Sequence, residues 1–143
     1  MRRHSSVFTS LDHFSKSLGG FEINSSYRGR STFFVLIGVA GLLLKSWLSD
    51  SLSDFAFSYV GNLSVSFAVY FIVRLAARGK LNPAFCAIFA LSTVELFEAT
   101  NGFGVMTNVY DRCDFLANAL GVALGVAVDV IASQVSLRRT TSE

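Results

Sequence analysis

The sequence predicts an all-α integral membrane protein, a bundle of four transmembrane helices with both termini in the cytoplasm. Of the 143 residues, 52% are hydrophobic and only 15% are charged, which is too apolar for an ordinary soluble domain. Apolar stretches of helical length alternate with short polar segments. The basic residues gather on every second polar segment, a pattern that is typical of multi-pass membrane proteins.

The predicted transmembrane domain covers residues 31–137, with spans at about 31–48, 55–73, 83–100 and 114–135. The first span is about 26 Å long as a helix, enough to cross a hydrocarbon core when its end residues snorkel. Lys45 and Trp47 mark its far interface. Asn82 and Pro83 form a pair that is typical of a helix start, and they open the third span.

Polar tails flank this domain. Residues 1–30 form a basic cytoplasmic tail, and residues 138–143 form the cytoplasmic C-terminal tail. Within the first tail, apolar residues recur at helical spacing: Phe8, Leu11, Phe14, Leu18 and Phe21. This spacing fits a short amphipathic helix in the headgroup region, whereas the abundance of Ser and Gly fits a disordered tail.

The distribution of charge gives the sidedness of the chain. With a cytoplasmic N-terminus, every Lys and Arg except Lys45 and Arg112 faces the cytoplasm. The opposite side collects the acidic residues Asp50, Asp54, Glu95, Glu98, Asp111 and Asp114. Removing any one span would break this alternation.

Two polar residues lie deep in the predicted spans. Glu95 is about 18 Å from the helix start at Pro83, well inside a hydrocarbon core of about 30 Å. Asn62 is about as far from Arg74 on the second span, so we expect Asn62 and Glu95 to lie level with one another. The sequence therefore predicts an outward-facing polar cavity, whose ligand-binding candidates are Glu95, Glu98, Asp111, Asp114, Asn118, Asn62 and Arg112.

Several of these residues also have a purely structural interpretation. Asp114 suits the N-cap of the fourth helix, with a second role left open, and Asp129 is expected to meet Arg74 or another base. Gly121 and Gly125 form a GxxxG pattern, which favours close helix packing.

Glu95 differs from these residues, because burying a carboxylate at its depth costs several kcal/mol. A structural role for Glu95 would need a dedicated partner, such as Arg112 or Asn62.

Three kinds of chemistry suit the predicted cavity. Carboxylates and amides can bind a polar head group or glycan, four carboxylates without His can hold Mg²⁺ or Ca²⁺, and Glu95 or Glu98 can carry a proton. No nucleophile motif, phosphate loop or cofactor fingerprint occurs, so we expect no cofactor, assign no metal ligands and favour binding over catalysis. The small net charge of +2 gives no support to a nucleic-acid partner. Cys86 and Cys113 are predicted to be free thiols near opposite membrane faces.

A spaced polar pattern joins the third and fourth spans. A Glu near the end of one helix is followed by Asp-x-x-Asp-x-x-x-Asn-x-x-Gly-x-x-x-Gly at the start of the next, and the residues are Glu95, Asp111, Asp114, Asn118, Gly121 and Gly125. This pattern resembles the signature half of the VanZ-like family of small bacterial membrane proteins. Glu98 stands where that family usually has Gln, and Asn108 takes the place of a loop Arg for which Arg112 is a candidate substitute.

The resemblance implies a cell-envelope protein of the bacterial cytoplasmic membrane, since the family is named for a protein associated with low-level resistance to teicoplanin. We expect such a protein to bind or shield a polar lipid-linked molecule, for example a glycan or peptidoglycan precursor, in contact with membrane lipids. Two alternatives remain: an ion-coupled or proton-coupled carrier or small membrane enzyme using Glu95, and a scaffold that packs on a partner through Gly121 and Gly125. The sequence leaves the choice between monomer and oligomer open.

Overall fold

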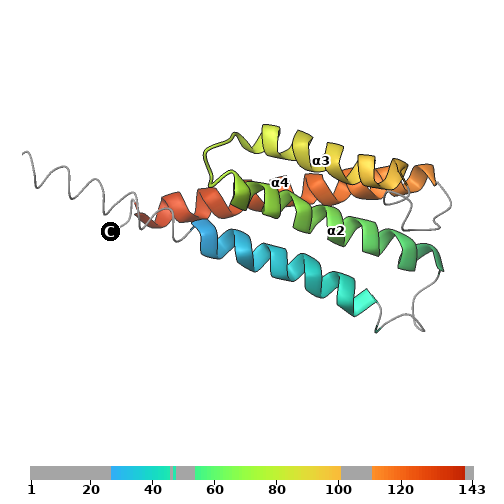
Figure 1. The fold of residues 1–143 in the computed structure, drawn as a ribbon. Coiled ribbons are helices and arrows are strands. Elements are labelled where there is room, and N and C mark those ends of the chain that lie inside the picture. Colours follow the sequence, from blue (N-terminus) through green and yellow to red (C-terminus); the bar gives the residue numbers. More distant parts are fainter. Residues whose placement is uncertain (1–26, 46, 48–53, 101–110, 141–143) are drawn as a thin grey trace, which may run out of the picture.

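The computed structural model describes residues 27–45, 47, 54–100 and 111–140, and these residues form an all-α structure. Its elements are an N-terminal helix, Tyr27–Lys45, followed by α2 (Asp54–Ala76), α3 (Pro83–Ala99) and α4 (Arg112–Thr140). The four helices run side by side as an elongated bundle (Figure 1). The all-α part of the predicted fold is therefore confirmed for the described residues.

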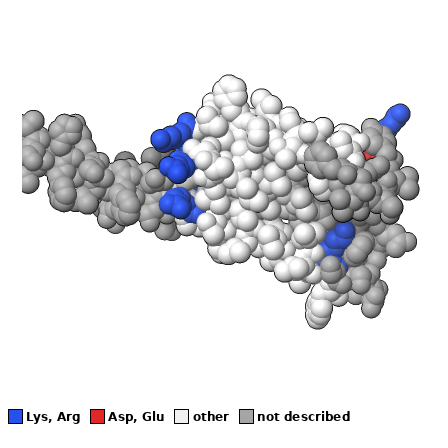
Figure 2. All heavy atoms as spheres, in the orientation of Figure 1, with Lys and Arg blue, Asp and Glu red and all other residues white. Residues whose placement is uncertain are grey.

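Three of these helices are long and apolar enough to cross a membrane: Tyr27–Lys45, Tyr59–Ala76 and Arg112–Ser136. Their outward side chains include large apolar residues such as Leu43 and Leu116, exposed by 66% and 65%. On the face shown in Figure 2, basic side chains lie near the two ends and an uncharged surface lies between them. A surface of this kind needs lipid around it, so the chain is a multi-pass membrane protein.

The N-terminal helix and α4 extend beyond the predicted spans. The N-terminal helix begins at Tyr27, inside the segment 1–30 that was predicted to be a tail, and α4 continues to Thr140, past the predicted ends at 135 and 137. Basic residues mark where a helix leaves the hydrocarbon, but Arg is a good helix former and does not end the helix. The hydropathy pattern therefore located the apolar helices and underestimated the length of the N-terminal helix and of α4.

The centre of the bundle is α2, which packs against both α3 and α4. Its aromatic residues Tyr70 and Phe71 are fully buried, and Cys86 and Ala90 of α3 pack with them. The N-terminal helix approaches α2 closely at Gly38, where a Cβ would lie 2.8 Å from the Cβ of Ala68. Only a residue without a side chain permits this approach.

A tight turn links α2 to α3. Arg78 and Gly79 both have positive φ, at 52° and 70°, and the chain then reverses direction. Asn82 caps α3, because its side chain accepts a hydrogen bond of 3.0 Å from the backbone N–H of Ala84, and Pro83 takes the first helical position. The predicted start of the third helix is confirmed.

Some predictions lie outside the described residues. These are the amphipathic pattern between Phe8 and Phe21, the loop acid Asp50, and the position of Asn108 in the loop between α3 and α4.

Candidate functional site

Six polar side chains from α2, α3 and α4 meet near the end of the bundle where α3 finishes and α4 begins. We call this group the polar cluster; its members are Asn62, Ser66, Glu95, Glu98, Asp114 and Asn118. Five of them were predicted site residues, and Ser66 was not. The residues form two layers, one helical turn apart, because each helix repeats its inward face every three to four residues.

The first layer is centred on Asp114, which is only 6% exposed. The amide nitrogen of Asn62 donates a hydrogen bond of 2.6 Å to Asp114 Oδ1. Glu98 lies within hydrogen-bonding reach of the same carboxyl group. Two carboxyl groups at such a distance share a proton unless a cation lies between them.

The second layer lies one turn further along α4, at Asn118. The Ser66 hydroxyl donates a hydrogen bond of 2.7 Å to Asn118 Oδ1, which leaves the Asn118 amide nitrogen directed to other acceptors. Glu95 lies within hydrogen-bonding reach of Asn118. The second carboxyl oxygen of Glu95, Oε2, is buried and has no hydrogen-bond partner within the described structure.

The prediction that Asn62 and Glu95 lie at the same depth is wrong by one helical turn. Asn62 pairs with Asp114, while Ser66 is the α2 residue at the level of Glu95 and Asn118. The depth of Asn62 was counted from Arg74 as a marker of the membrane face, but Arg74 lies inside the bundle and is only 6% exposed. A single Ser in an apolar helix does not by itself indicate a functional site. The only sequence feature that indicates Ser66 is its spacing of four residues from Asn62, which puts both on one helix face.

Asp111, and not Asp114, caps α4. The helix begins at Arg112, and the Asp111 carboxylate accepts a hydrogen bond of 3.0 Å from the backbone N–H of Cys113. The Tyr59 hydroxyl donates a second hydrogen bond, of 2.9 Å, to Asp111. These two donors hold the pKa of Asp111 below its ordinary value. The predicted N-cap role of Asp114 is therefore wrong, and its carboxylate is instead used in the polar cluster.

The two basic residues at this end behave differently. Arg112 is exposed and forms no ion pair with any carboxylate in the described ranges, so it is not the partner of Glu95 that was considered. Lys45 of the N-terminal helix reaches over α2, where its Nζ would lie 2.6 Å from a Cβ added at Gly61. Its positive charge also acts on Asp114. The sequence predicts only an interface position for Lys45.

The two glycines of α4 pack inside the chain. A Cβ at Gly121 would collide with the Leu63 carbonyl oxygen, and a Cβ at Gly125 would lie 2.8 Å from the Tyr70 ring. Close helix packing is confirmed for both. The partner surface in this pair of helices is α2 itself, so the glycines are not available to a second protein.

A second polar group lies at the opposite end of the bundle. Asp129 is 1% exposed and binds two guanidinium groups, Arg74 Nε at 2.8 Å and Arg30 Nη2 at 3.0 Å. Tyr70 donates a further hydrogen bond of 3.1 Å to the same carboxylate. The expectation that Asp129 meets Arg74 is confirmed. These contacts hold the N-terminal helix, α2 and α4 together, which is a structural role.

The chemistry of the polar cluster is dominated by acceptors. It has three carboxyl groups, and its hydroxyl and amide donors are directed at neighbours within the cluster. In the part of the chain that the structure describes, no group of three metal-ligating side chains is placed to hold a metal ion. The cluster is therefore suited to a group that donates hydrogen bonds, or to a proton shared between carboxyl groups.

The fold and this site define an α-helical multi-pass membrane protein with a polar centre inside its bundle. No family model, curated protein or solved structure matches the chain in the comparisons made with them. Both cysteines are free, as predicted, with Cys86 buried and Cys113 exposed.

Proposed function

We propose that the chain is a VanZ-like envelope protein of the bacterial cytoplasmic membrane, which binds or shields a polar lipid-linked molecule at the polar cluster. The observation that carries this proposal is the meeting of Asp114 with Asn62 and Glu98. Three helices contribute to one buried carboxyl centre, and placing such a group in a membrane is costly without a use. Three of the six residues on which the resemblance rests, Glu95, Asp114 and Asn118, belong to the polar cluster.

The proposed ligand presents hydrogen-bond donors to the cluster. Carboxylates accept from hydroxyl and ammonium groups and repel phosphate, so a sugar or amino-sugar part of the ligand faces Glu95 and Asp114. An apolar groove of about 410 Å³ lies beside this end of the bundle, lined by residues that include Leu63, Leu116 and Leu120. A lipid chain attached to the ligand fits such a groove.

The proposal includes four spans and two cytoplasmic termini. α3 has 17 residues, about 26 Å as a helix, and it exposes Phe85, Ile88 and Phe89 along its outer face. A helix of that length can span the membrane if it tilts little and its end residues snorkel to the interface. With α3 across the membrane, the polar cluster faces outward and the Asp129 group faces the cytoplasm.

Susceptibility to teicoplanin tests the proposal. Wild-type protein and the variants Glu95→Gln and Asp114→Asn are expressed at matched levels in a susceptible bacterial host. Thr93→Val is the control, because Thr93 lies on α3, is exposed and bonds only to the Phe89 carbonyl among the contacts described. We expect the wild type and the control to reduce susceptibility to teicoplanin and other envelope stresses, and the two variants to lose this effect. Equal behaviour of all four proteins would refute the proposal.

A proton-coupled carrier is the second candidate function. It is favoured by the contact between Glu98 and Asp114 and by the unpartnered Oε2 of Glu95, since each suits a mobile proton. In liposomes with an internal pH dye, this candidate requires proton flux that Glu95→Gln abolishes and Thr93→Val leaves intact. Flux equal to that of protein-free liposomes would exclude it.

A further inference from the structure

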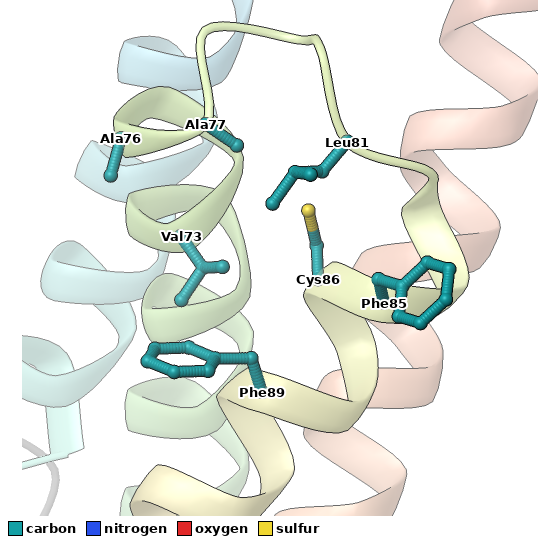
Figure 3. Close-up of a pocket in the computed structure, with 7 residues that line it drawn as sticks. All are labelled: Val73, Ala76, Ala77, Leu81, Phe85, Cys86 and Phe89. Atoms are coloured by element: carbon teal, nitrogen blue, oxygen red, sulfur yellow. The ribbon is translucent and has the colours of Figure 1, made fainter.

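A groove of about 450 Å³ separates the end of α2 from the start of α3 (Figure 3). Val73 and Ala77 line one side, Phe85 and Phe89 line the other, and Leu81 closes the end at the turn. The Cys86 sulfur is the only heteroatom among the side chains drawn there. The groove is therefore a place for hydrocarbon.

The groove faces the lipid. Phe85 and Phe89 are exposed by 67% and 64%, so no described helix covers this side of α3. Within a membrane, the molecules that meet such a surface are lipid chains. Phe85 and Phe89 lie four residues apart on α3, so the groove follows this helix for at least about 6 Å.

The mouth of the groove is basic. Arg78 and Lys80 lie in the turn above Leu81, both are exposed, and no acidic residue occurs between Arg74 and Val94. Arg78 adopts a positive φ of 52°, which is uncommon for a residue other than Gly or Asn. The Arg74 guanidinium donates a hydrogen bond of 2.7 Å to the Leu81 carbonyl and so fixes the turn against the bundle.

We propose that this groove is a binding site for one anionic phospholipid, with an acyl chain between α2 and α3 and the phosphate on Arg78 and Lys80. The positive charges of Arg78 and Lys80 select an anionic head group, and the apolar lining of the groove holds the acyl chain. Each base near a membrane surface changes the binding of an anionic lipid by about five-fold. The groove lies at the opposite end of α3 from the polar cluster, so this proposal rests on the proposed position of α3 in the membrane and not on the proposed ligand of the cluster.

Lipid retention tests the site. The protein is reconstituted in nanodiscs with equal amounts of phosphatidylglycerol and phosphatidylcholine, released into mild detergent and measured by native mass spectrometry. We expect the wild type to retain phosphatidylglycerol in preference, and Arg78→Gln combined with Lys80→Gln to reduce that preference about twenty-fold. Ala77→Leu, which fills the groove, should reduce retention of both lipids.

The control is Arg28→Gln, which removes an exposed charge from the N-terminal helix at the same end of the bundle. Thermal unfolding of every variant in the same detergent shows that the fold is kept. Equal retention of the two lipids by the wild type would overturn the proposal, as would an equal effect of Arg28→Gln. Binding of inorganic phosphate with no lipid retained would also overturn the proposal, as would a second copy of the chain bound in the groove.

Discussion

Asn62 of α2 and Asp114 of α4 are joined by a hydrogen bond of 2.6 Å between side chains 52 residues apart in the sequence. Of the hydrogen bonds described between α2 and α4 this one is the shortest, and it reaches a carboxylate that is only 6% exposed. The polar cluster therefore both holds two helices together and keeps a carboxyl group at a fixed place inside the bundle.

Removing the amide of Asn62 should destabilise the protein. In Asn62→Ala the Asp114 carboxylate loses its donor, so we expect a loss of about 1–3 kcal/mol in the free energy of unfolding. A double-mutant cycle with Asp114→Ala, followed by thermal unfolding in mild detergent, isolates the pair, and a coupling of at least about 0.5 kcal/mol is expected. Strictly additive effects would show that the two residues do not interact.

Much of this arrangement could be predicted from the sequence, and the exceptions have physical reasons. The spans and most cluster members follow from hydropathy and from acids placed in apolar helices, as with Glu95 and Asp114. The level of Asn62 could not be predicted, because an Arg at the end of an apolar span indicates the membrane surface, whereas Arg74 is drawn inside the bundle by Asp129. Ser66 could not be singled out because a hydroxyl is common in transmembrane helices.

Gly121 should tolerate no side chain. In Gly121→Ala the new Cβ meets the Leu63 carbonyl oxygen, a backbone atom that cannot rotate away. Overpacking of this kind costs about 1–3 kcal/mol, whereas replacing Gly by Ala in a helix gains about 1 kcal/mol. We therefore expect a net loss in the free energy of unfolding of up to about 2 kcal/mol. Ala123→Leu, at an exposed position of the same helix, is the control and should leave the unfolding temperature nearly unchanged. If Gly121→Ala were more stable than the wild type, the close approach of α2 and α4 would be wrong.

Substitution of Asp129 should destabilise the protein more than substitution of Arg30, its partner at the end of the bundle opposite the polar cluster. Asp129→Asn leaves two guanidinium groups without a counter-charge, and breaking a buried pair in this way costs about 3–5 kcal/mol. Arg30→Gln should cost less, because the Arg30 side chain is 22% exposed and Arg74 still neutralises Asp129. Detergent stability and expression level measure both variants. An Arg30→Gln variant less stable than Asp129→Asn would contradict this account.

The two native thiols report the proposed topology. Cys113 is exposed at the end of the polar cluster, whereas Cys86 is buried near the opposite end. A membrane-impermeant maleimide should therefore label the wild type in right-side-out vesicles, and Cys113→Ser should remove the label. Labelling confined to inside-out vesicles would place the polar cluster on the cytoplasmic side and reverse the proposed orientation.

The most direct test of the central claim is native mass spectrometry of the gently extracted protein beside its Asp114→Asn variant. The account predicts that the wild type carries a bound molecule with the mass of a lipid-linked saccharide, in excess over bulk phospholipid. It also predicts that Asp114→Asn carries at least about ten-fold less, since a hydrogen bond to a charged group contributes about 1.5–3 kcal/mol. The same bound masses on both proteins, or bulk phospholipid alone on each, would contradict the claim that the polar cluster binds a lipid-linked polar ligand.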